Sequence, residues 1–153
     1  KVLLPIIGEN YKESKDFKKF INSGPIIVDV SFSSKKNNEN MIRSNSIFMM
    51  DVTIKDSGNE NFLRKDEFKI TLEKIQVYDE NIENCDFDIT SKDSEHQSLR
   101  LKEDFSLLNK KPLKCLLKAK EIEANIWDYG IITIDYNYRY NILNNLKIEV
   151  NPI

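Results

Sequence analysis

The chain has 153 residues, the size of one domain, so we expect a single domain over residues 1–153. Hydrophobic residues make up 40% and charged residues 31%, which supplies a core and excludes disorder along the whole length. No apolar run approaches the roughly 20 residues of a membrane span, and 23 basic against 25 acidic residues give a net charge of −2. We therefore expect no membrane span and no nucleic acid as the main partner.

Lys, Asn and Ile together make up more than a third of the chain, a bias typical of an AT-rich genome. The first residue is Lys1 rather than a start methionine. A signal peptide or a lipid anchor would therefore lie upstream of the sequence given.

The two cysteines, Cys85 and Cys115, stand 30 positions apart, and His96 is the one histidine of the chain. This set lacks the ligands of a zinc site, so we expect no metal. Two alternatives remain: two buried free thiols, or one disulfide between strands. A location outside the cytoplasm would favour the disulfide.

The first elements are predicted from apolar spacing and from stop signals. Residues 2–7 form an edge strand or a tail that docks on the core. A helix over residues 12–22 is indicated by Ser14 as a cap and by apolar residues at helical spacing, namely Phe17, Phe20 and Ile21. Gly24 and Pro25 then end it.

After Pro25 the apolar period changes to two, which predicts half-buried strands. They cover residues 26–32, 47–55, 68–72, 85–89, 99–101, 130–140 and 146–150. Ile75 and Val77 are interpreted as an extension of the third of these. Residues 113–126 fit both a helix and a strand, with Pro112 and the Lys, Glu and Ala content favouring the helix.

This order of elements predicts a mainly β fold: an antiparallel two-sheet sandwich, transthyretin-like or immunoglobulin-like, with one or two short helices. Strands and helices do not alternate as a doubly wound nucleotide-binding fold requires. The four glycines are isolated, so no phosphate-binding loop can be built from them, and we expect no cofactor. His96 lies in a polar loop and is interpreted as a solvated side chain.

The absence of nucleophile, metal and phosphate signatures predicts a non-enzymatic binding or assembly protein, with no catalytic residue and another protein as partner. The alternative is a hydrolase or carbohydrate-active enzyme of jelly-roll type that works through two carboxylates. Such a pair must lie about 5–9 Å apart in one groove. Asp51 and Asp135 are its candidates, because each points away from the apolar face of its strand.

The polar loop over residues 33–45 is the predicted contact surface, since loops carry most binding residues. It holds two neighbouring apolar side chains, Met41 and Ile42, which form either a contact tip or a pair tucked against the sandwich edge. If they form the tip, Lys35, Lys36 and Arg43 would steer an acidic partner toward it.

Four segments in order resemble the outer-membrane lipoprotein of the type VI secretion membrane complex, the TssJ family. They are residues 24–30 (GPIIVDV), 47–51 (IFMMD), 61–70 (NFLRKDEFKI) and 129–136 (YGIITIDY). The resemblance implies a transthyretin-like sandwich with an added helix, a periplasmic or extracellular location, and docking of an inner-membrane partner without catalysis. The chain departs from the family at Tyr138-Arg139, where a Trp-Arg pair is usual, and in having a cysteine pair.

Overall fold

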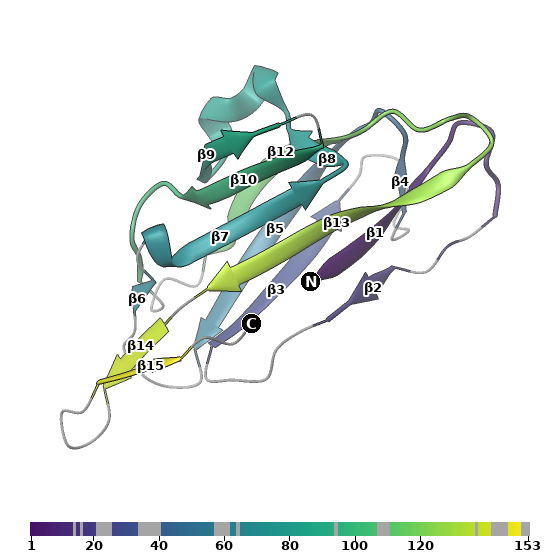
Figure 1. Ribbon diagram of the computed structural model, residues 1–153. Coiled ribbons are helices and arrows are strands. Elements are labelled where there is room, and N and C mark those ends of the chain that lie inside the picture. Colours follow the sequence, from purple (N-terminus) through teal and green to yellow (C-terminus); the bar gives the residue numbers. More distant parts are fainter. Residues whose placement is uncertain are drawn as a thin grey trace.

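The computed structural model describes residues 1–13, 15, 17–20, 26–33, 41–56, 62–63, 65–93, 95–106, 111–136, 138–141 and 147–150. Within them, two β-sheets lie face to face, as Figure 1 shows. Every strand pair is antiparallel except one. The predicted mainly β, two-sheet sandwich is therefore confirmed.

The front layer in Figure 1, sheet A, has the strand order β2-β1-β13-β7-β10-β9, and β4 pairs in parallel with β1. Its strands are β1 (Val2–Ile7), β2 (Lys18–Lys19), β4 (Ile42–Arg43), β7 (Phe68–Glu73), β9 (Phe87–Lys92), β10 (His96–Leu101) and β13 (Trp127–Tyr136). Sheet B has the order β3-β5-β12-β8, with β3 (Ile26–Ser33), β5 (Ile47–Asp56), β8 (Ile75–Val77) and β12 (Leu113–Ala119).

Four short strands form two small ladders, β6 (Phe62–Leu63) with β11 (Phe105–Ser106) and β14 (Tyr138–Asn141) with β15 (Lys147–Val150). The described helical segments are two 3-10 turns, η1 (Lys65–Glu67) and η2 (Asp79–Asn84).

The core forms where the period-two apolar faces of the two sheets meet. Phe68, Ile70 and Leu72 of β7 point into it from sheet A, each with no more than 1% of its surface exposed. Cys115 and Leu117 of β12 meet them from sheet B. Each large side chain buried in this way stabilises the fold by roughly 1.5–3 kcal/mol.

Strand β1 lies inside sheet A rather than at its edge. It pairs with β13 along one side, and with β2 at Val2 and Leu3 and β4 at Ile6 and Ile7 along the other. Pro5 falls between the stretches covered by β2 and β4, where neither strand pairs with β1. A residue without an N–H is tolerated at such a gap.

The predicted helix over residues 12–22 is wrong for the part of it that the structure describes, because Lys18 and Lys19 form β2. Phe17 and Phe20 would share one helix face, yet Phe17 packs on the core against Phe32 and Phe20 is 59% exposed. A helix of this length is marginal without a buried face. Pairing with the open side of β1 gives the backbone groups of Lys18 and Lys19 hydrogen-bond partners instead. The predicted cap, Ser14, lies outside the described residues.

The helix favoured for residues 113–126 is also wrong, and the strand alternative holds for Leu113–Ala119. Strand β12 is paired on both sides, with β5 and with β8, and Cys115, Leu117 and Ala119 all point into the core. This burial on the pleated surface outweighs the helix propensity of Lys and Ala.

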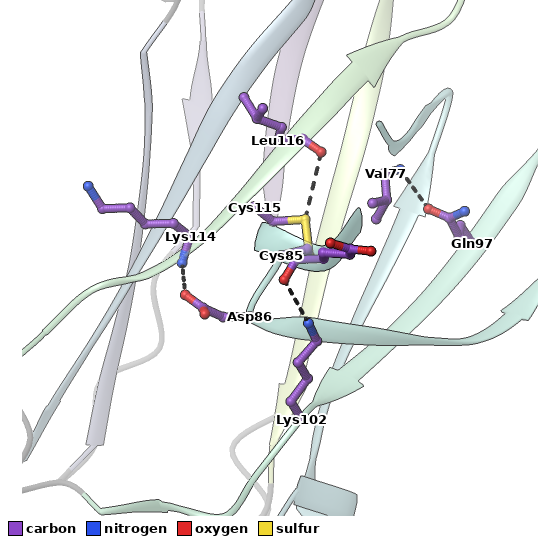
Figure 2. Close-up of a disulfide and its surroundings, with 9 residues drawn as sticks. Val77, Cys85, Asp86, Gln97, Lys102, Lys114, Cys115 and Leu116 are labelled. Atoms are coloured by element: carbon purple, nitrogen blue, oxygen red, sulfur yellow. Dashed lines mark hydrogen bonds between the residues drawn. A yellow bond between two sulfur atoms is a disulfide. The ribbon is translucent and has the colours of Figure 1, made fainter. Parts of the chain in front are cut away.

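A disulfide joins Cys85 to Cys115, with a Cα–Cα distance of 4.2 Å. Both cysteines are at most 2% exposed. The bond ties β12 of sheet B to the segment that leads through η2 into β9 of sheet A, as Figure 2 shows. Beside it, Lys114 N–H donates to a carboxylate oxygen of Asp86 at 2.7 Å, and Asp86 N–H donates to Lys114 C=O at 2.9 Å.

Reducing this disulfide is expected to lower the free energy of unfolding by about 3–4 kcal/mol, because the unfolded chain then loses the restraint on a loop between cysteines 30 positions apart. Urea unfolding of the oxidised and the reduced protein measures the difference. Two titratable thiols in unreduced, denatured protein would contradict the bond itself.

Candidate functional site

The candidate site is a pocket of about 270 Å³ at one end of the sandwich. It is lined by residues 45, 74–76, 92, 93, 95–97 and 118–121, and we call it the corner pocket. Its walls come from the β4–β5 turn, the β7–β8 junction, the β9–β10 hairpin and the end of β12. This end lies opposite the β14–β15 ladder in Figure 1.

Two walls of the corner pocket are corners at which the chain crosses from sheet A to sheet B. Lys74 is the one residue between β7 and β8, and Asn45 lies between β4 and β5. Both have left-handed backbone conformations, with φ of 62° at Lys74 and 59° at Asn45, and no other described non-glycine residue has a positive φ. Asn tolerates this conformation better than most residues do, whereas for Lys it stores strain.

The backbone of Lys120, just after β12, holds both corners in place. Its N–H donates to Lys74 C=O at 3.0 Å, and its C=O accepts from Asn45 N–H at 3.4 Å. Lys74 N–H in turn donates to Glu95 C=O of the β9–β10 hairpin at 3.2 Å. Three connections that are distant in sequence therefore meet around one pocket.

The side chain of Lys74 forms a hydrogen-bonded ion pair with Asp128 of β13. This bond raises the pKa of Lys74 above its ordinary value. Burial alone would raise the pKa of Asp128, but the hydrogen bonds from Lys74 and from Tyr129 N–H together hold it below its ordinary value. The pair anchors the β7–β8 corner to β13, so this lysine is already occupied within the chain.

The β9–β10 hairpin places His96 at the pocket between two carboxylates. The backbone N–H groups of Glu95 and His96 donate to Asp93 Oδ1 at 2.9 and 2.7 Å, and they hold the pKa of Asp93 below its ordinary value. His96 Nδ1 lies 3.6 Å from Asp93 Oδ1, and His96 Nε2 lies 3.9 Å from Glu73 Oε2. None of the described lining residues carries a hydroxyl or a thiol.

Gln97 is the one polar side chain of the described part that is fully buried, with 2% of its surface exposed. Its Oε1 accepts a hydrogen bond from Val77 N–H at 2.7 Å, which Figure 2 shows. Tyr78 N–H donates to Leu116 C=O of β12, so the preceding N–H, that of Val77, faces the outer edge of β8. Gln97 of sheet A therefore caps the outer edge of sheet B.

A second hollow, of about 640 Å³, adjoins the corner pocket and shares Asn45 and Glu121 with it. It is lined by residues 9, 43–45 and 121–124. Ser44 Oγ fastens its two walls, donating to Ile122 C=O at 3.2 Å and accepting from Ile122 N–H at 2.6 Å. Gly8 permits close packing beside it, since a Cβ there would lie 2.1 Å from Glu123 C=O.

The predicted contact residues occupy different environments. Lys35 and Lys36 lie outside the described residues. Ile42 is buried and pairs with Ile6 of β1, and half-buried Met41 accepts a hydrogen bond from Lys15 N–H at its sulfur. Of the two alternatives for this side chain, Ile42 is therefore tucked against the edge of the sandwich and does not form an exposed contact tip. Arg43 is exposed and lines the second hollow.

The two candidate catalytic carboxylates do not share a groove. Asp51 lies between buried Met50 and Val52 of β5 and so belongs to the outer face of sheet B. Asp135 precedes buried Tyr136 in β13, on the outer face of sheet A. Both layers of the sandwich separate the two, so they cannot flank one scissile bond.

No family model, curated protein or solved structure matches the chain. Among the described residues, no helix is long and apolar enough to cross a membrane.

The burial of Ile42 predicts that substitutions at Ile42 and at its neighbour Met41 lower the free energy of unfolding by different amounts. Ile42→Ala removes a fully buried side chain and is expected to lower the free energy of unfolding by about 2–5 kcal/mol. Met41→Ala, at a half-buried position, is expected to cost less. Urea unfolding of both variants measures this, and an equal loss in the two would contradict the placement.

Proposed function

We propose that this chain is a non-enzymatic binding or assembly protein that docks another protein at the end of the sandwich formed by the corner pocket and the second hollow. The observation that carries this proposal is the continuity of the two hollows through Asn45 and Glu121. Their walls are fixed by backbone hydrogen bonds between connections that are far apart in sequence. Rigid scaffolds that position several loops at one end are typical of binding proteins.

Arg43 is the residue through which this surface would meet a partner. It is exposed, it lines the second hollow, and it follows directly on the buried Ile42 that holds β4 against β1. A cation on a fixed strand end is well placed to pair with an acidic group of a partner and to raise the rate of encounter.

The disulfide supports a periplasmic or extracellular location. Both cysteines of the chain are used in it, and both are buried. Disulfides of this structural kind persist in oxidising compartments and are rare where thiols are kept reduced.

A more specific form of the proposal follows from the resemblance to the TssJ family. Under it, the chain is a periplasmic lipoprotein subunit of a bacterial secretion apparatus that docks an inner-membrane partner, with a lipid anchor upstream. The sandwich architecture and an oxidising location are compatible with this role. The helix that the resemblance implies is not present over the described part of residues 12–22.

A carboxylate hydrolase or carbohydrate-active enzyme remains the second candidate. Its two candidate carboxylates cannot act together, because Asp51 and Asp135 lie on opposite outer faces of the sandwich. We therefore rank it below the binding role.

The test compares partner capture by three forms of the protein: the natural chain, Arg43→Glu and Lys55→Glu. Lys55 is the matched control. It is also exposed, and it lies near the far end of β5, the strand that follows the β4–β5 turn. Cross-linking in the native source, read by mass spectrometry, identifies the partner. Arg43→Glu is expected to reduce its capture at least about tenfold, because like charges then face each other, at an unchanged melting temperature.

Lys55→Glu is expected to capture the partner as the natural chain does. Equal capture by all three forms would place the contact elsewhere on the molecule. Equal losses in both variants would mean that net charge, and not this surface, governs the interaction.

A further inference from the structure

The buried amide of Gln97 is left with an unused donor. Its Oε1 is held by Val77 N–H at 2.7 Å, which fixes the orientation of the amide and turns Nε2 away from Val77 (Figure 2). Nε2 is buried and has no hydrogen-bond partner among the described residues. A buried amide N–H₂ without an acceptor is destabilising, so this group calls for an oxygen that the described residues do not supply.

Gln97 is also one of the residues that line the corner pocket. Ile75 and Ala119, both buried, add an apolar part to the lining. A volume of about 270 Å³ is far more than one water needs. It lies just below the range for drug-sized ligands, which suits a small metabolite.

The lysines around the pocket are the second observation, and they are independent of Gln97. Lys92, Lys118 and Lys120 all line it, and none of them forms an ion pair within the described part of the chain. The fourth lysine, Lys74, is occupied by Asp128. On the acidic side, Asp93 is engaged by two backbone N–H groups, which leaves Glu95 and Glu121 against the three lysines.

We propose that the corner pocket binds a small organic carboxylate, independently of any protein partner. One carboxylate oxygen accepts from Gln97 Nε2, and the ammonium groups of Lys118 and Lys120 neutralise the charge. A carboxylate is suited to this set because it only accepts hydrogen bonds, and charge-assisted bonds to it are the strongest available here. None of the described lining residues is a Phe, Tyr or Trp, the side chains that offer a sugar ring the largest stacking surface.

The proposal is tested by nuclear magnetic resonance on the full chain labelled with ¹⁵N. The protein is titrated with succinate, and separately with succinamide, which has the same carbon skeleton without the charge, at matched ionic strength. Succinate is expected to shift the Gln97 side-chain N–H₂ signals and the Val77 N–H signal in a saturable way. Succinamide is expected to leave them nearly unchanged.

Three variants sharpen the test. Lys118→Gln and Lys120→Gln are expected to weaken succinate binding at least about tenfold each, because each removes a charge-assisted contact. Lys55→Gln, on the same sheet but outside the pocket, is the control and is expected to bind as the natural chain does.

Three outcomes would overturn the proposal. If neither probe shifts the Gln97 N–H₂ signals, the donor is satisfied by a buried water alone. If succinamide shifts them as strongly as succinate does, or if Lys55→Gln weakens binding as much as the pocket variants, charge recognition in the corner pocket is absent.

Discussion

The architecture depends on two corners at which the chain turns from one sheet into the other. Asn45 and Lys74 both take the left-handed conformation, and the backbone of Lys120 bonds to both. The strands that begin after these corners, β5 and β8, are the two neighbours of β12 in sheet B. Lys120 follows directly on β12, so one residue links the ends of three adjacent strands.

The candidate site is a consequence of the same corners. The pocket of about 270 Å³ lies where two crossings from sheet A to sheet B stand side by side. The edge of β8 is closed there by the side chain of Gln97 and not by another strand. A buried amide is thereby placed in the lining, with lysines around it. The corner pocket therefore arises from how the sandwich is closed and not from an added loop.

Period-two patterning predicted most of the long strands, since each strand of a sandwich buries one of its two faces, but it did not identify β2 or β12. The same pattern also marks two further features of the structure. Apolar residues fall at even positions in Phe68, Ile70 and Leu72 and at odd positions in Ile75 and Val77, and the change of parity marks the corner at Lys74. Gln97 shares its parity with Leu99 and Leu101, which places it among core residues.

Other features could not be predicted from local pattern. Lys has no preference for a positive φ, so the conformation of Lys74 follows from its tertiary hydrogen bonds alone. Lys18–Lys19 and Leu113–Ala119 form strands and not the predicted helices because strand edges competed for their backbone groups. Helix propensity is a weak preference that such pairing outweighs. The tucked position of Ile42 likewise depends on β1, a distant partner.

The most direct test of the corner account is the free energy of unfolding of Lys74→Gly compared with that of Lys74→Val. Both substitutions remove the ion pair with Asp128, so the difference between them isolates the backbone conformation at φ 62°. Glycine adopts this conformation freely and valine does not. The account predicts that the valine variant unfolds with a free energy about 1–3 kcal/mol lower, despite the greater strand propensity of valine. A valine variant as stable as the glycine variant would contradict it.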